Sequence, residues 1–231
     1  MEDYYHKYIK YKTKYLELKS QLKNKQMGGK NREVIFHISG PSGAGKTTLG
    51  NKLKERFGNY IVVVDIDDLR KDFVKYRYGG YNKVWGKQNF KWDHRSYQKY
   101  IDKFVAKQTK PLVFVGLNHM PWWHKKLYYN MHGDYNYYIK LDSDTIFKQK
   151  CGRLIEKFTN EKDIIIKEIM DNEKETVKAL QNDIKYECGY KETTQMNNIW
   201  NKDYQKQGYK IMSREKILEE VIEKLNRILD N

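Results

Sequence analysis

Residues 40–47 read GPSGAGKT, and this stretch decides which fold the sequence predicts. It matches the pattern G-x-x-x-x-G-K-[ST] at every fixed position. Residues 34–39 before it are apolar and β-branched like a buried parallel strand, and residues 47–57 after it carry Leu and Phe at helical spacing ahead of Gly58. A strand, a glycine-rich turn and a helix together aim backbone N–H groups and the positive end of the helix dipole at a polyphosphate. The sequence therefore predicts that the chain binds a nucleoside triphosphate.

Two side chains of this stretch have expected roles of their own. Lys46 would reach the β- and γ-phosphates, and the Thr47 hydroxyl would bind a Mg²⁺ ion. ATP and Mg²⁺ are therefore the expected cofactors. The residues expected to contact the nucleotide are Gly40, Ser42, Gly43, Ala44, Gly45, Lys46, Thr47 and Thr48.

The length and the cysteines limit the number of domains and the cellular compartment that we expect. The 231 residues allow one α/β domain with a core, expected over residues 30–231, and a short extension over residues 1–29. Cys151 and Cys188 show no metal-type spacing, and we expect reduced thiols in a cytoplasmic protein. No apolar stretch has the length of a membrane span, and the charged N-terminus argues against a secretory signal.

The chain is strongly basic, with 45 Lys and Arg against 30 Asp and Glu and a net charge of +15. Such a balance favours a polyanionic partner such as nucleic acid. The chain is also rich in Lys, Asn, Tyr and Ile, the residues of A/T-rich codons. Coding bias could therefore supply much of the positive charge. The charge is consistent with a nucleic-acid-binding surface but does not establish one.

Residues 1–26 form a separate segment, in which Tyr and Leu recur at alternating steps of four and three on a lysine-rich helix. This seam predicts packing on the main domain or self-association with a second chain, and a targeting tag is the alternative. The tyrosine-lysine repeat followed by Gly28 and Gly29 resembles leaders found on many proteins of giant DNA viruses. That resemblance implies a viral origin and a location in the host cytoplasm.

Apolar runs alternate with helical patterns along the rest of the chain, which predicts a parallel five-stranded sheet with helices on both faces. Ligands of such sheets bind beyond the carboxyl ends of the strands, where the phosphate loop, residues 65–68 and Asn118 would converge. Ser213 is the expected N-cap of a closing helix. The expected strands are residues 34–39, 60–64, 112–115, 135–141 and 209–212, and the expected later helices are residues 145–158, 164–185 and 192–207.

Three carboxylates, Asp65, Asp67 and Asp68, follow the second expected strand. A carboxylate beside an acceptor hydroxyl can take its proton and orient its attack, although Asp at a strand end is also a common turn former. Arg70 comes early in the next helix and could hold an anionic part of the acceptor, or be an ordinary surface charge.

The loop followed by a strand and Asp67-Asp68-Leu69-Arg70 resembles the P-loop kinases of small molecules and polynucleotides. Gluconate-type, zeta-toxin-type and 5′-hydroxyl polynucleotide kinases carry an acidic residue there, and the last has Asp-Asp-x-Arg in the same place. The resemblance implies a three-layer P-loop NTPase fold with Asp67 as general base and Arg70 as a ligand of a substrate phosphate. Asp65 would serve the Mg²⁺ shell or replace Asp67 as base, and Asp68 is a further candidate substrate ligand.

The same resemblance extends to a basic lid helix after the fourth strand. In these kinases, lid cations close over the ATP phosphates, and here the first candidate is Arg153, followed by Lys150. The alternative is a solvated basic helix face. Asn118 follows the third expected strand, where many P-loop enzymes have an acidic residue that helps hold Mg²⁺. The absence of that acid makes an NTP-hydrolysing motor less well supported than a kinase. Asn118 could instead contact substrate.

Aromatic and basic residues crowd the expected acceptor side, in residues 76–95 and at Trp122 and Trp123. Interleaved rings and cations grip bases and phosphates, whereas ordinary packing of a helical subdomain explains the same pattern. Trp122 is the aromatic candidate to contact substrate. The sequence thus favours an ATP-dependent phosphotransferase acting on a nucleotide-like acceptor. A kinase of a small metabolite and a non-catalytic ATP-binding protein of a virion or of nucleic acid remain alternatives.

Overall fold

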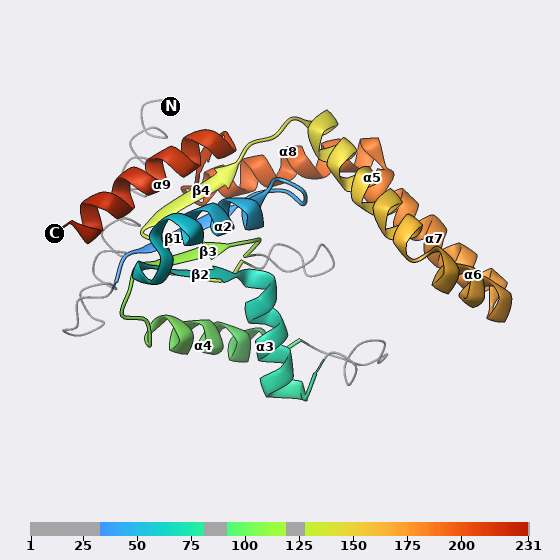
Figure 1. Ribbon diagram of the computed structural model, residues 1–231, viewed down its shortest axis with the longest axis horizontal. Helices are drawn as coiled ribbons and strands as arrows, with labels where there is room; N and C mark the ends of the chain where they lie inside the picture. The colour runs from blue at the N-terminus through green and yellow to red at the C-terminus, as the bar shows by residue number, and fades with distance from the viewer. Residues whose placement is uncertain (1–32, 81–91, 119–127, 231) are drawn as a thin grey trace, which may run out of the picture. The chain divides into compact units, whose positions relative to one another are not determined.

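The computed structural model describes residues 33–80, 92–118 and 128–230 (Figure 1). The predictions for the N-terminal segment, including its self-association, and for Trp122 fall on residues outside these ranges. No helix in the described ranges is long and apolar enough to cross a membrane.

The centre of the fold is a sheet of five strands in the order β2-β3-β1-β4-β5, and every neighbouring pair is parallel. Phe36 on the central strand pairs with Val113 of β3 on one side and with Tyr135 of β4 on the other. The predicted α/β class with a parallel five-stranded sheet is confirmed. The strands are β1 (Ile35–Ser39), β2 (Val62–Asp65), β3 (Leu112–Val115), β4 (Tyr135–Ile139) and β5 (Lys210–Met212).

Helices cover both faces of the sheet (Figure 1). Because successive strand side chains point to opposite faces, Phe36 and Ile38 of β1 join the core formed with α2 and α9, whereas Ile35 joins the core formed with α3 and α4. The helical elements are α2 (Lys46–Phe57), the 3-10 turn η1 (Gly58–Tyr60), α3 (Ile66–Tyr78), α4 (His94–Val105), α5 (Ser143–Asn160), α6 (Lys162–Asp171), α7 (Glu173–Cys188), α8 (Tyr190–Lys206) and α9 (Arg214–Leu229).

Several helices begin where the sequence places a capping side chain. The carboxylate of Asp142 accepts a hydrogen bond from the backbone N–H of Thr145, which caps α5. The hydroxyl of Ser213 caps α9 in the same way, as predicted. The single helix expected over residues 164–185 is instead two helices, because the chain turns at Asn172 between α6 and α7.

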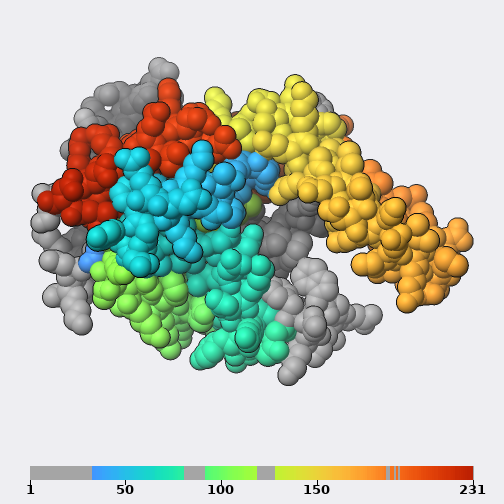
Figure 2. All heavy atoms as spheres, in the orientation of Figure 1, coloured from blue at the N-terminus to red at the C-terminus, as the bar shows by residue number. Residues whose placement is uncertain are grey.

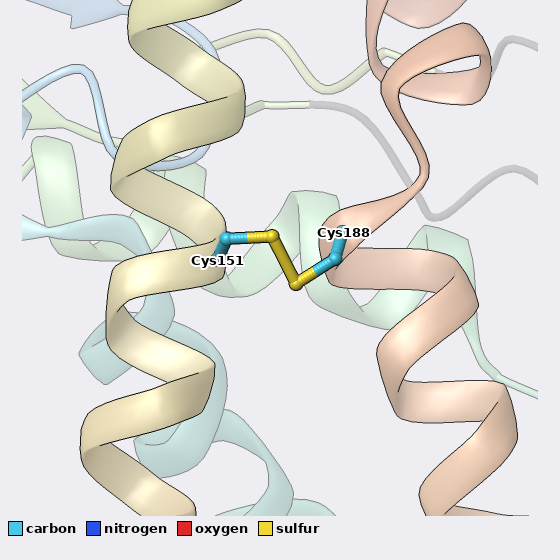
Figure 3. The surroundings of a disulfide bond; sticks show 2 residues. All are labelled: Cys151 and Cys188. Atoms are coloured by element: carbon cyan, nitrogen blue, oxygen red, sulfur yellow. A yellow bond between two sulfur atoms is a disulfide. The ribbon is translucent and has the colours of Figure 1, made fainter.

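The prediction of reduced thiols is wrong for the structure. Cys151 on α5 and Cys188 at the end of α7 form a disulfide, with 5.0 Å between their Cα atoms (Figure 3). The two residues lie 37 positions apart in the chain and meet because α7 packs back along α5. No sequence spacing indicates such a pairing, since it depends on how two long helices pack.

Candidate active site

The loop between β1 and α2 lies at the carboxyl end of the central strand, where a parallel sheet binds its ligands. Gly43 and Gly45 have φ angles of 82° and 76°, in the left-handed region that glycine adopts without strain. A Cβ atom at Gly45 would also lie 2.8 Å from Nη1 of Arg214. The loop therefore needs glycine at these two positions for its backbone, and the flexible side chain of Arg214 lies close over Gly45.

Lys46 folds back over the loop that precedes it. Its Nζ donates hydrogen bonds to the carbonyl oxygens of Gly40 at 2.9 Å and Pro41 at 2.8 Å. The pKa of Lys46 is lowered from 10.5 to about 8, mainly by burial and also by the charge of Arg153, while the carboxylates of Asp67 and Asp65 act in the opposite direction. The ammonium thus lies near one other cation, on α5, and two carboxylates, at the junction of β2 and α3.

Thr47 and Asp65 join α2 to the end of β2. The Thr47 hydroxyl donates to Oδ2 of Asp65 at 3.0 Å. The other carboxylate oxygen of Asp65 accepts a hydrogen bond from the backbone N–H of Asp67 at 2.9 Å and caps α3. Asp65 is therefore both a helix cap and a neighbour of the hydroxyl expected to bind metal.

Asp67 is exposed and held by Arg70. The Arg70 guanidinium donates to Oδ1 of Asp67 at 2.8 Å and also to the carbonyl oxygen of Leu117, beyond the end of β3. The side chain of Asp67 is 69% exposed, whereas that of Arg70 is only 16% exposed. Arg70 thus fixes one carboxylate oxygen of Asp67 and leaves the carboxyl group open to solvent. Asp68 instead pairs with Lys71 on the exposed side of α3, at 2.7 Å.

Arg153, the first candidate lid cation, lies at the loop, and its closure over ATP stays a prediction. Its Nη2 donates to the hydroxyl of Ser42 at 2.9 Å. Its neighbour Gln149, one turn earlier on α5, places Oε1 3.1 Å from the position of a Cβ at Gly43. Helix α5 therefore covers one side of the loop, and Figure 2 shows its atoms against the residues that follow β1.

Sequence reasoning missed Gln149 and Arg214, two polar side chains that lie over loop glycines. Arg214 is the first residue of α9 and comes directly after the capping Ser213. The capping serine predicts where the helix begins, but it does not predict that the arginine side chain lies over the phosphate loop. Gln149 lies in the basic stretch that was expected to form the lid. A basic or polar residue in such a stretch gives no local sign of which loop it contacts.

Asn118 lies in a buried network below the site and is 3% exposed. Its carbonyl oxygen accepts from the Tyr204 hydroxyl at 2.8 Å, and its amide donates to the Tyr129 carbonyl at 3.1 Å and to the Tyr209 hydroxyl at 3.2 Å. The side-chain amide of Asn118 is thus hydrogen-bonded within the protein. A contact between Asn118 and substrate stays a prediction.

The same network reaches the strand that leads into the loop. The Tyr209 hydroxyl lies 2.5 Å from Nδ1 of the buried His37, and Nε2 of His37 lies 3.0 Å from the Gly116 carbonyl oxygen. Burial lowers the pKa of His37 to about 4, which keeps the ring neutral. Nε2–H therefore donates to Gly116 and Nδ1 accepts from Tyr209, so that His37 joins β1 to the residue before β5 and to the residue after β3.

The described residues fit a bound Mg²⁺-nucleotide in two respects. The glycines at positions 43 and 45 give the loop the left-handed turns of a phosphate-binding loop, and the hydroxyl of Thr47 and the carboxylate of Asp65 are hard oxygen donors of the kind Mg²⁺ prefers. Within the described ranges, no group of three or more His, Cys, Asp or Glu side chains could hold a metal ion by itself. A metal at this site would therefore depend on phosphate oxygens and water as further ligands.

Comparisons with known proteins add little to this geometry. No protein-family model matches the chain, and no curated protein sequence does. Among solved structures, the crystal structure of tRNA delta(2)-isopentenylpyrophosphate transferase from Staphylococcus epidermidis is similar, with a TM-score of 0.45 and 11% sequence identity. The match covers 84% of this chain and 99% of that one.

Proposed function

We propose that the chain is an ATP-dependent phosphotransferase that moves the γ-phosphate of ATP to a hydroxyl of a nucleotide-like acceptor. The observation that carries this proposal is the exposed carboxylate of Asp67, held by Arg70 beside the loop that contains Lys46. The N-terminus of α3 is already capped by Asp65, so the side chain of Asp67 is not required as a helix cap. It is available to an acceptor.

The donor side of the site is cationic. Lys46, the loop backbone and Arg153 would hold the phosphates, and Ser42 already accepts a hydrogen bond from Arg153. A preorganised cation at the transferred group stabilises the charge that develops in the transition state. Arg214 over Gly45 is a further cation on the nucleotide side.

Thr47 and Asp65 are the residues that would hold Mg²⁺. When bound, the ion supplies charge neutralisation at the β- and γ-phosphates. Because Asp65 is engaged with Thr47 and with the start of α3, it is less suited than Asp67 to accept a proton from a substrate.

In the transfer, the acceptor hydroxyl gives its proton to Asp67 while its oxygen forms a bond to the γ-phosphorus. The bond between that phosphorus and the bridging oxygen breaks, and ADP leaves with the electron pair. Arg70 keeps one oxygen of Asp67 in a fixed position through its hydrogen bond, so we assign it a positioning role. Its second hydrogen bond, to the Leu117 carbonyl, ties that position to the end of β3.

The test is incubation with γ-labelled ATP and a panel of acceptors: 5′-hydroxyl RNA, 5′-hydroxyl DNA, nucleosides, nucleotides and sugars. We expect a nucleotide-like acceptor to be labelled, and Asp67→Asn to lower transfer by about 10²–10⁴-fold while ATP affinity is retained. The matched control is Asp163→Asn, which changes an exposed carboxylate on α6. Labelling of sugars alone would favour a metabolite kinase. No labelled acceptor, with Asp67→Asn silent, would favour an ATP-binding protein without transfer.

A further inference from the structure

A groove of about 780 Å³ lies between α3 and α4, away from the phosphate loop. The two helices pack against each other, and Figure 2 shows them side by side at the surface. Aromatic rings form part of the groove wall. Tyr76 is 77% exposed, and its ring lies 6.0 Å from the ring of Tyr100 between centroids, at an angle of 33°. The partly buried ring of Phe104 continues this wall.

Basic side chains line the same groove. Lys99, Lys103 and Lys107 follow one another at four-residue steps along α4 and the turn after it, so they share one side. All three are exposed, and none of them forms an ion pair with a residue that the structure describes. Arg77 adds a fourth cation at the end of α3.

The carboxylates near the groove leave it positive. Asp93 accepts hydrogen bonds from Ser96 and lies 3.6 Å from Arg77. Burial raises the pKa of the Tyr100 hydroxyl, and the charge of nearby Asp72 raises it further. Asp102, also on α4, is instead engaged by His132 and Gln98. Asp72 and Asp93 thus stand against the four cations of the groove.

We infer that this groove binds a single-stranded polynucleotide. The exposed ring of Tyr76, continued by partly buried rings, lies beside unpaired lysines and suits a ligand that has both flat, unstacked bases and a chain of phosphates. In a duplex the bases are stacked on one another and are not available to stack on these rings. An acidic peptide could pair with the lysines but has no bases to stack on the rings. The residues that line the groove begin at Phe73 and include none of the candidate active-site residues. The inference therefore does not depend on phosphoryl transfer at the loop.

The test uses the full chain and fluorescein-labelled oligo(dT) and oligo(U) of about 20 nucleotides, followed by fluorescence anisotropy without ATP. The double variant Lys99→Glu with Lys103→Glu should weaken binding at least tenfold at about 0.1 M salt. It should also reduce the slope of log affinity against log salt by about 1.4, as expected for two lost phosphate contacts on a single strand. The oligo(dT) and oligo(U) arms tell whether DNA and RNA are both bound.

The matched control is Lys202→Glu with Lys206→Glu, which makes the same charge change at the same helical spacing on the exposed side of α8. This control should leave affinity close to that of the unaltered chain. Tyr76→Ala should weaken binding about tenfold, whereas Tyr76→Phe should retain it, because stacking needs the ring and not the hydroxyl. Since these side chains are exposed, thermal unfolding should be unchanged in every variant.

Three results would overturn the inference. Equal losses in the α4 and α8 double variants would indicate attraction by overall charge alone. Full binding by Tyr76→Ala would indicate a polyanion site without base stacking. Competition by a duplex or by heparin as strong as that of the single strand would exclude the proposed ligand. A chain that binds single strands through the groove but labels no acceptor would leave this inference standing and reject the proposed transfer.

Discussion

Nη2 of Arg153 donates a hydrogen bond to the hydroxyl of Ser42 at 2.9 Å, and this bond joins the helix after β4 to the loop after β1. The two residues are 111 positions apart in the chain. Because Arg153 also lowers the pKa of Lys46, its positive charge reaches the centre of the loop. The relationship makes α5 a part of the site.

Arg153→Ala should lower kcat by about 10²–10³-fold with a smaller change in the KM for ATP, because a lid cation acts most strongly on transition-state charge. Steady-state kinetics with the acceptor identified by labelling measure this split. Lys157→Ala is the control, since Lys157 lies one turn further along α5, half exposed and 3.8 Å from Asp183. Similar losses in both variants would show that α5 matters only for packing.

ATP affinity should fall as the pH rises through about 8, where half of the Lys46 side chains have lost their charge. The folded-state pKa of Lys46 is below the usual 10.5, so about half of the side chains are uncharged at pH 8, and the charged form that would hold ATP predominates only at lower pH. Calorimetric titration with ATP between pH 7 and 9.5 measures the effect. Lys46→Met should bind ATP weakly at pH 7 and show a flat profile. If ATP affinity in Lys46→Met depended on pH as steeply as in the unaltered chain, a group other than Lys46 would be responsible for the pH dependence.

His37 should make the protein less stable in acid. An unfolded chain takes up a proton at His37 near pH 6.5, whereas the folded protein resists protonation until about pH 4. The unfolded state therefore binds more protons in this window, and stability falls as the pH falls, by about 3 kcal/mol for this group. The measurement is urea unfolding at pH 7 and pH 4.

The comparison variant for this effect is His37→Gln. At pH 7 it should be less stable than the unaltered chain by about 1–3 kcal/mol, because the Tyr209 hydroxyl and the Gly116 carbonyl lose their partner. At pH 4 the difference should shrink by about 3 kcal/mol. A gap that is independent of pH would mean that His37 does not titrate as described.

Reduction of the Cys151–Cys188 disulfide should lower the free energy of unfolding by about 3–4 kcal/mol, as the chain-entropy argument gives for residues 37 apart. Thermal unfolding with and without dithiothreitol measures the change, and mass spectrometry after alkylation shows the thiol state. Cys151→Ser and Cys188→Ser should have the same effect, and neither should respond to reductant. Equal stability of the oxidised and reduced chain would contradict a stabilising bridge.

Local sequence was sufficient where the interacting residues are neighbours in the chain. The strand before the loop, the loop and α2 follow from residues 34–57, and the carboxylates of Asp65 and Asp67 lie at the start of α3 as expected. Ser213 capping α9 is a second such case. Strand alternation and capping are set within a few residues, which is why their pattern can be read directly.

The lid shows the limit of such reading. A basic helix after the fourth strand was expected, and Arg153 lies at the loop. Gln149 and Arg214 lie over the same loop, yet neither has a local pattern that distinguishes it from a surface residue. Their roles depend on where α5 and α9 pack.

The sequence by itself determined the α/β class, the glycine-rich turn between strand and helix, and the order of the acidic residues after β2, because each depends on neighbours in the chain. Only the tertiary structure decided that His37 meets Tyr209 across 172 residues, that Cys151 pairs with Cys188, and that a basic groove opens between α3 and α4. These relationships arise from the packing of distant elements, whose geometry is set by the whole core and is not written in any one segment.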